Sequence, residues 1–216
     1  MKDIKAIKGK FYIQRLIEEG EHLHQDFKFA ISDARKIARS ISAFANNDGG
    51  SLLIGVKDNG VIAGIRTEED IYVVEQAAQM YCRPEQSIEF TAYKTEGGNV
   101  VVKADVKKAE LRPVKAIDDT GKWKAYYRVK DENIMASSLM VKAWNEEQTY
   151  DGAILEISDA EKSLLDLLEE GPMSVADLTK KVHISRQKAE QLIINLYLMN
   201  VVDFIHDEKE FKLILI

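Results

Sequence analysis

Cysteine and proline are scarce in this sequence, which has one cysteine, Cys82, and three prolines among 216 residues. A single cysteine cannot form an intramolecular disulfide, so a disulfide-stabilised secreted domain is excluded and we expect Cys82 to be a buried apolar residue. No segment approaches the roughly 18 consecutive apolar residues that cross a bilayer. The N-terminal residues also lack the apolar core of a signal peptide. We therefore expect a cytoplasmic protein with no membrane partner.

Two common site patterns are missing as well. The sequence contains no G-x-x-x-x-G-K-[ST] loop, so ATPase chemistry based on that phosphate-binding loop is not predicted. The four histidines lack a Cys or His partner at zinc-site spacing; they are His22, His24, His183 and His206. The leading interpretation therefore includes no cofactor.

Basic residues do not predominate either. The formal net charge is −6, with 36 Asp or Glu against 30 Lys or Arg. A protein that neutralises phosphates normally shows a basic face, although a basic groove can coexist with an acidic remainder. The composition, 45% hydrophobic and 31% charged, is that of a globular protein. The length allows one domain of ordinary size and a smaller second one.

Hydrophobic periodicity over residues 1–145 predicts alternating helices and strands. Helical spacing of apolar residues predicts helices over 4–19, 67–81 and 134–144, and one from the N-cap Ser32 to about Asn46. Apolar or alternating runs predict strands over 24–29, 51–56, 87–95, 99–107 and 123–129, and a hairpin that turns at Asp58-Asn59-Gly60 into Val61-Ile62. The alternation predicts an α+β domain, an α/β-like sandwich of a mixed sheet and helices.

Residues 157–216 carry strong helix-start signals. Three serines occupy N-cap positions, namely Ser158, Ser174 and Ser185. Glu161 completes a capping-box pattern with the first of them. Residues 201–216 then alternate as a two-stranded hairpin that turns at Asp207-Glu208. Helix, short helix, turn, long helix and hairpin in this order predict a small C-terminal winged helix-turn-helix, joined to the first domain by a linker over 146–156.

One stretch resembles a known family. Residues 43–60, AFANNDGGSLLIGVKDNG, followed by Gly64, are similar to the signature of the Schlafen AlbA-like domain. Upstream, Glu21 and Asp26-Phe27-Lys28 resemble the family's acidic residue and its Glu-Phe-Lys run. Downstream, Tyr126-Tyr127-Arg128-Val129 resembles its closing strand. The resemblance implies a nucleic-acid-binding domain. Because bacterial members often carry a C-terminal winged helix and are described as DNA-binding regulators, it also implies a bacterial regulator of transcription.

The resemblance further implies a catalytic alternative. It aligns Glu21, Asp26 and Asp58 with three acidic residues that form a metal-dependent RNA-cleaving centre in some animal Schlafens. Carboxylates hold Mg²⁺ or Mn²⁺, which can polarise a phosphate and activate water. A structural interpretation remains open, because Asp58 opens a turn and Glu21 follows a helix-ending glycine. A Mg- or Mn-dependent ribonuclease is therefore an alternative function with candidate rather than firm catalytic and metal-binding residues.

Candidate nucleic-acid contacts lie in both domains. The basic residues expected on one surface of the first domain are Lys28, Lys115, Lys124, Arg128 and Lys130, of which the last three share strand parity. Those expected to face DNA in the second are Lys180, Lys181, Arg186, Gln187, Lys188 and Gln191. Arg and Gln near the start of a recognition helix can read base edges, while lysines can contact phosphates. Lysines scattered over a solvated face are the alternative interpretation.

The leading interpretation is a DNA- or RNA-binding protein, specifically a homodimeric DNA-binding transcriptional regulator without enzymatic activity. Residues 157–216 contain seven Lys or Arg against eleven Asp or Glu, a formal net charge of −4. This balance also fits a module for protein docking or dimerisation. A non-enzymatic protein-interaction adaptor is therefore a third interpretation, beside the regulator and the ribonuclease.

Overall fold

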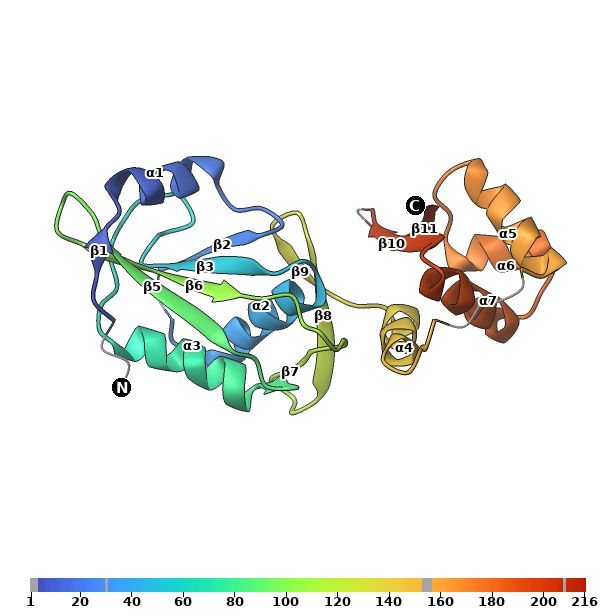
Figure 1. Cartoon of the computed structure of the whole chain (residues 1–216), viewed down its shortest axis with the longest axis horizontal. Coiled ribbons are helices and arrows are strands. Elements are labelled where there is room, and N and C mark those ends of the chain that lie inside the picture. Colours follow the sequence, from blue (N-terminus) through green and yellow to red (C-terminus); the bar gives the residue numbers. More distant parts are fainter. Residues whose placement is uncertain (1–3, 30, 153–156, 208) are drawn as a thin grey trace. The chain divides into compact units, whose positions relative to one another are not determined.

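The computed structural model describes residues 4–29, 31–152, 157–207 and 209–216. The chain forms two compact units, Met1–Ala136 and Ser137–Ile216, and each is described by itself (Figure 1). The described residues include no helix that is both long and apolar enough to cross a membrane.

The first unit is built on a five-stranded mixed sheet with the order β1-β5-β6-β3-β2. Its strands are β1 (Ile7–Lys8), β2 (Gln25–Lys28), β3 (Gly50–Ile54), β5 (Ile88–Lys94) and β6 (Val100–Val106). β1 pairs with β5 and β2 with β3 in parallel, whereas β6 runs antiparallel to both β3 and β5. Because successive side chains of a strand point to opposite faces, these strands contribute to two separate cores.

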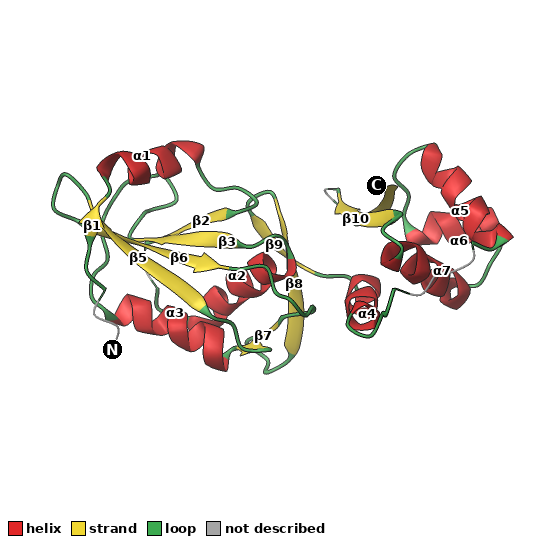
Figure 2. Ribbon diagram, in the orientation of Figure 1, coloured by secondary structure: helices red, strands yellow, loops and turns green. Residues whose placement is uncertain are grey.

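Different helices cover the two faces of this sheet (Figure 2). On one face, α1 (Lys10–Glu19) packs Ile13 and Leu16 against Phe27 and other strand residues. On the other, α2 (Ala34–Asn46) and α3 (Glu69–Met80) pack against the larger apolar cluster, to which β3 contributes Leu52 and Ile54. The alternation of β3 is visible in this division, since Leu53 belongs to the α1 face.

A second sheet lies against α2. Its strand order is β4-β7-β8-β9, with β4 (Cys82–Arg83), β7 (Lys115–Ile117), β8 (Trp123–Val129) and β9 (Glu132–Met135). α2 contacts β7 and β8 as well as β3 and β6, and every residue from Ser40 to Asn46 is buried. Sheet, helix and second sheet form a layered sandwich, which confirms the predicted α+β class.

Side-chain amides at the end of α2 hold the second sheet in place. The Asn46 amide donates to the carbonyl oxygens of Val114 and Tyr126, both at 2.8 Å, and its Oδ1 accepts from Val114 N–H at 2.7 Å. Asn47 Oδ1 accepts from Arg128 N–H at 2.8 Å, and Asn47 Nδ2 donates to the Arg128 carbonyl at 3.1 Å. These amides take the place of strand partners for the inner backbone groups of β8 and the segment before β7.

Several elements differ from those predicted. Asp33, rather than Ser32, caps α2 by accepting from Arg35 N–H at 2.9 Å. The predicted hairpin at 58–62 is reduced to a single bridge between Val56 and Ile62, because β3 pairs with β2 and β6 instead. The start of the predicted helix 134–144 is the strand β9, and the short strands β1, β4 and β7 were not predicted. Cys82 is buried as expected, and burial raises the pKa of its thiol to about 12.

The described residues of the second unit form four helices and one hairpin. Its elements are α4 (Ser138–Glu147), α5 (Asp159–Glu169), α6 (Val175–Val182), α7 (Arg186–Leu198), β10 (Val202–His206) and β11 (Phe211–Leu215). α5 begins with the predicted capping box, in which Ser158 Oγ accepts from Glu161 N–H and Glu161 Oε2 accepts from Ser158 N–H. Ser174 and Ser185 cap α6 and α7 as predicted.

α4 belongs to this second unit, where it packs against α7. The division at 136/137 therefore precedes this helix, whereas the sequence placed it in a domain ending at residue 145. Of the predicted linker, residues 153–156 lie outside the described residues, and so does Glu208 of the predicted hairpin turn. The remaining turn residue, Asp207, accepts hydrogen bonds from Lys209 and Glu210 N–H.

Replacing Asn46 with alanine is expected to destabilise the first unit. The change leaves the Val114 N–H and the Tyr126 carbonyl without the Asn46 amide, whereas the Val114 carbonyl keeps its bond from Ser42 Oγ. A buried unpaired polar group costs about 1–3 kcal/mol. We expect the free energy of unfolding in urea to fall by about 3 kcal/mol or more. The control is Asn59→Ala, which removes only an exposed hydrogen bond to Val61 N–H. Equal effects of the two substitutions would contradict the role assigned to Asn46.

Candidate functional site

β2 places two charged residues on the face that looks toward α2. Asp26 and Lys28 are two positions apart and share that face, while Phe27 between them lies in the core under α1. Asp26 is only 4% exposed, so its carboxylate must be compensated by neighbouring groups. Lys28 Nζ lies 2.9 Å from Asp26 Oδ2, and Ser40 Oγ on α2 donates to the same oxygen at 3.2 Å.

Arg128 on β8 is the second cation beside Asp26. Its Nη2 lies 3.6 Å from Asp26 Oδ1. Burial alone would raise the pKa of Asp26, but the ion pair with Lys28, the hydrogen bond from Glu21 and the charge of Arg128 outweigh it. The pKa of Asp26 therefore lies below its ordinary value, and this carboxylate is charged at neutral pH.

Glu21 lies in contact with Asp26. α1 ends at Gly20, whose φ of 74° lies in the left-handed region, and the chain then turns back so that Glu21 Oε1 accepts from Phe27 N–H at 2.8 Å. Burial and the hydrogen bond to Asp26 raise the pKa of Glu21 above its ordinary value. The two carboxyl groups thus share one site with opposite shifts, and Glu21 is the member of the pair that takes up a proton more readily.

Asp58 does not join this pair. It is exposed and follows the C-terminal end of β3, whereas Glu21 precedes the N-terminal end of the parallel strand β2. Over the described part of the chain, no three His, Cys, Asp or Glu side chains are grouped closely enough to hold a metal ion. The residues present therefore do not fit the Mg²⁺ or Mn²⁺ centre expected from Glu21, Asp26 and Asp58. The Asp26 carboxylate is instead occupied by two protein cations.

Arg128 is a structural residue, which corrects its assignment to an exposed basic surface. It is 1% exposed, and its Nη2 donates to the carbonyl oxygens of Gln25, at 3.1 Å, and His22, at 3.3 Å. Its Nη1 donates to Asn133 Oδ1 at 3.0 Å, and its guanidinium lies 5.0 Å from the centre of the Phe44 ring. The guanidinium therefore fastens β8 to the segment before β2, and a phosphate cannot reach it.

The other basic residues predicted in the first unit do not form one surface. Lys124 shares the inner face of β8 with Arg128 and is paired with Asp118 at 2.8 Å. Lys130 is exposed in the turn between β8 and β9, and Lys115 is half-buried in β7. Strand parity is not decisive here because that face of β8 packs on α2 rather than facing solvent.

Lys28 borders a shallow pocket that the sequence analysis missed. It has a volume of about 480 Å³ and is lined by Lys28, Lys36, Arg39, Ser40, Glu132 and Asn133. The signal that could have found it is the spacing of Lys36, Arg39 and Ser40, which places all three on one side of a helix. No signal pointed to Asn133, because β9 was expected to be helical.

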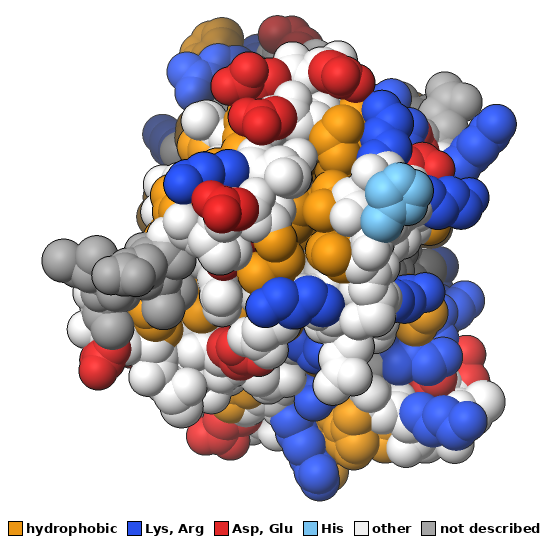
Figure 3. Space-filling model, turned by 90° about the vertical axis from the view of Figure 1, so that its right-hand side faces the viewer, with side chains coloured by type: hydrophobic (Ala, Val, Ile, Leu, Met, Phe, Trp, Pro, Cys, Tyr) orange, Lys and Arg blue, Asp and Glu red, His pale blue; other side chains and the backbone are white. Residues whose placement is uncertain are grey.

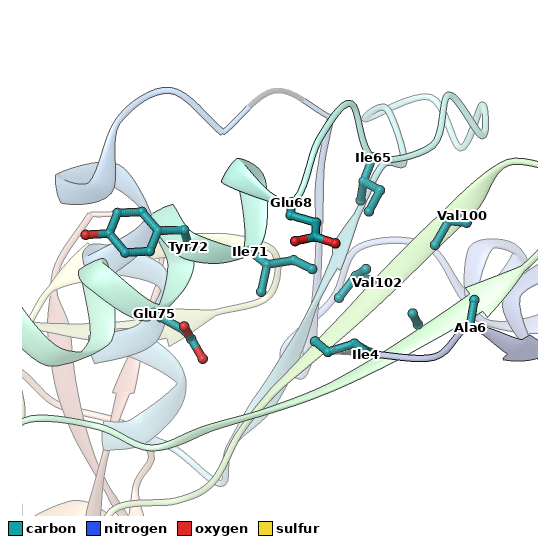
Figure 4. Close-up of a pocket in the computed structure, with 10 residues that line it drawn as sticks. Ile4, Ala6, Ile65, Glu68, Ile71, Tyr72, Glu75, Val100 and Val102 are labelled. Carbon is teal, nitrogen blue, oxygen red and sulfur yellow. The ribbon is translucent and has the colours of Figure 1, made fainter. Parts of the chain in front are cut away.

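A larger cavity of about 560 Å³ lies elsewhere in the first unit, between α3 and the sheet (Figure 4). Its lining is mainly aliphatic, with Ile65, Ile71 and Val102 among the contributors. Its two charged residues, Glu68 and Glu75, are both acidic, so this cavity has no cation for a phosphate.

The predicted DNA-facing residues of the second unit are all exposed. They lie at the end of α6 and the start of α7, and are Lys180, Lys181, Arg186, Gln187, Lys188 and Gln191. Glu190 pairs with Arg186 at 2.9 Å and with Lys142 of α4 at 2.6 Å. Figure 3 shows Lys and Arg side chains on the same face of the molecule as Asp and Glu side chains. Positive groups at the start of α7 are thus available to a ligand but locally balanced.

One side of α7 packs into the second unit. Ala189, Leu192, Ile193, Ile194 and Leu196 are buried, with Ile194 at 2% exposure. α4 is among the elements that pack on α7. The exposed side of α7 includes Gln187 and Gln191.

The opposite pKa shifts of Asp26 and Glu21 predict opposite effects of neutralising them. Since the pKa of Asp26 is lowered in the folded state, its stabilising contribution is fully present above the unfolded value near pH 4 and is lost as pH falls through the lower folded value. We expect Asp26→Asn to cost about 3 kcal/mol or more at pH 7, because Arg128 and Lys28 lose their partner, and to cost less at pH 3.

Glu21→Gln is the matched comparison, because it mimics the protonated state that the raised pKa favours. A carboxyl with a raised pKa stabilises the fold when protonated and loses that contribution as pH rises. We therefore expect Glu21→Gln to be neutral or stabilising at pH 7. Urea unfolding at pH 7 and pH 3 measures both variants, and equal losses at both pH values would rule out the charge network.

Comparison with solved structures identifies remote similarity. One similar structure is that of the DIP2311 protein from Corynebacterium diphtheriae. The match has 18% identity, covers 88% of this chain and 34% of that chain, and has a TM-score of 0.44. Another is the N-terminal domain of an ATP-dependent DNA helicase RecG-related protein from Nitrosomonas europaea, with 20% identity over 67% of this chain and 94% of that one, and a TM-score of 0.42. The present chain spans about a third of the C. diphtheriae structure. Neither likeness is close enough to assign a function.

A search of curated proteins found no match. A comparison with family descriptions matched residues 21–137 to the family described as Schlafen, AlbA_2. The matched segment begins at Glu21, includes every strand of the two sheets around α2 except β1, and ends where the second unit begins. Because the match covers more than half of the 216 residues, this protein belongs to the Schlafen AlbA_2 family.

Proposed function

We propose that this protein binds nucleic acid and acts as a DNA-binding regulator of transcription. The observation that carries the proposal is the exposed start of α7, where Arg186, Gln187 and Lys188 follow directly on the Ser185 cap. A helix N-terminus attracts phosphates through its free N–H groups and its dipole. Arg and Gln there can also pair with base edges.

The order of elements in the second unit supports this proposal. α5, α6 and α7 are followed by the β10–β11 hairpin, the order expected of a winged helix-turn-helix. The turn between α6 and α7 is short, and His183 closes α6 in the left-handed conformation with a φ of 56°. This conformation redirects the chain at once into α7, the recognition helix of the proposal.

Several carboxylates of residues 157–216 have local partners. Glu161 is 2% exposed and belongs to the capping box of α5. Asp177 accepts from Ser174 Oγ at the start of α6, and Asp207 pairs with Lys212 in the hairpin. These carboxylates therefore have roles in the fold of the second unit.

A homodimer is part of the proposal. Helix-turn-helix proteins commonly place two recognition helices in two half-sites one DNA turn apart. A pair of chains related by a two-fold axis satisfies this geometry.

Removing the charges at the start of α7 tests the proposal. We expect the double substitution Arg186→Ala with Lys188→Ala to weaken binding to labelled duplex DNA by tenfold or more, since each charge-assisted contact contributes about 1.5–3 kcal/mol. The dependence of binding on salt should also become less steep, by about one unit per lost phosphate contact. Gel-shift titrations at two salt concentrations measure both effects.

Lys162→Ala on α5 is the matched control, because Lys162 is exposed and pairs only with Asp159 at 3.2 Å in the same helix. The Lys162→Ala variant should bind duplex DNA with the affinity of the wild type. The proposal fails if the wild type does not bind duplex DNA, or if the α7 variant binds it as tightly as the control does.

A further inference from the structure

The pocket bordered by Lys28 is unusually rich in positive charge. β2 contributes Lys28, α2 contributes Lys36 and Arg39, and the acidic member of the lining is Glu132 on β9. Lys28 and Arg39 are each paired with a carboxylate, so Lys36 is the lining cation that has no ion pair in the described part of the chain. The overall acidity of the chain, with a formal net charge of −6, makes such a local concentration more notable.

These cations are only partly compensated by the protein. Lys28 is paired with Asp26, and Arg39 Nη2 donates to Asp119 Oδ2 at 2.9 Å. Lys36 is exposed and forms no ion pair with another described residue. The Nε of Arg39 is shielded from solvent yet has no hydrogen-bond partner in the described part of the chain. A buried donor without a partner is costly, so the Arg39 guanidinium is incompletely satisfied by the protein.

The wall of the pocket is held by the buried network around Asp26. Asn133 Nδ2 donates to Ser40 Oγ at 3.0 Å, and Asn133 Oδ1 accepts from Arg128 Nη1 at 3.0 Å. Ser40 in turn donates to Asp26. Arg39 adjoins Ser40 in α2, so this network fixes the backbone from which the guanidinium extends. A ligand would therefore meet cations whose anchors are already in place.

The shape and charge of the pocket select the class of ligand. A phosphate group carries several acceptor oxygens, which suit the fork of a guanidinium and the point charge of a lysine. The pocket is shallow and open, so a phosphate that is part of a longer strand can enter without being enclosed. A small apolar ligand would meet four charged side chains around this opening.

We propose that the pocket formed by Lys28, Lys36 and Arg39 binds a phosphate group of a nucleic-acid strand. The choice of nucleic acid as the source of the phosphate rests on the proposed function, whereas the phosphate chemistry rests on the pocket alone. In the resting protein Asp119 accepts from Nη2 of the Arg39 guanidinium, and the phosphate competes with Asp119 for this group.

The test measures binding of short single-stranded DNA and RNA and of duplex DNA to the full chain by fluorescence anisotropy at several salt concentrations. Lys36→Gln and Arg39→Gln are each expected to weaken binding about tenfold for the strand that occupies the pocket. Each should also reduce the salt slope by about one unit. Lys94→Gln on β5 is the matched control, since Lys94 is an exposed lysine outside the pocket.

Asp119→Asn provides a test that does not depend on losing a contact. Asp119 has a side-chain exposure of 68%, so its replacement leaves the core intact while it frees Arg39. We expect this variant to bind the same strand severalfold more tightly than the wild type. An unchanged affinity in the Asp119, Lys36 and Arg39 variants alike would overturn the pocket proposal.

Titration calorimetry with inorganic phosphate and with a free nucleotide separates the two sources of phosphate. One outcome is that the wild type binds no strand and yet binds inorganic phosphate, with this phosphate binding lost in the Arg39→Gln variant. That result would overturn the claim that nucleic acid supplies the phosphate, and the proposed function would fail with it. If the α7 variant loses duplex binding while the pocket variants bind every strand normally, the proposed function stands and the pocket proposal is overturned.

Discussion

The hydrogen bonds from α2 to the inner strands of the second sheet are the interaction on which the first unit depends. A helix buried on all sides normally carries only apolar residues, yet the last part of α2 buries Ser40, Ser42, Asn46 and Asn47. Their side chains bond to β8, to the Val114 backbone and to one another. An amide buried at this depth must be fully bonded, so the second sheet can dock on α2 in one register only.

The same helix organises the charged groups. Ser40 bonds to Asp26 on β2 and to Asn133 on β9, so one α2 residue joins both sheets. Arg128 completes the link by bonding to the carbonyl oxygens of His22 and Gln25. Lys36, one turn before Ser40, and Arg39, directly before it, also line the pocket. The buried and the solvent-facing parts of the charge network are thus set by the rotation of a single helix.

Burial divides the candidate residues into those that stabilise the fold and those that can meet a ligand. Arg128 and Asp26 are almost fully buried and compensate one another, in the manner of a buried ion pair supported by additional hydrogen bonds. Lys36 and the residues at the start of α7 are exposed. Sequence motifs do not separate these groups, because the signature residues of a family include both packing and binding positions.

Local signals were sufficient for the starts of α5, α6 and α7, where the serines at 158, 174 and 185 cap the helices as predicted. They were also sufficient for the residues of the family match. These features depend on neighbours a few residues apart. Three features depended on contacts between distant parts of the chain, such as the hydrogen bond of Asn46 with Tyr126, 80 residues away. They are the burial of Arg128, the separation of Asp58 from the acidic pair and the pocket at Lys36. Strand alternation shows that the two faces of β8 differ, but only the docking of α2 decided which of them is buried. The reason is that a contact between distant segments leaves no periodic pattern in the sequence of either segment.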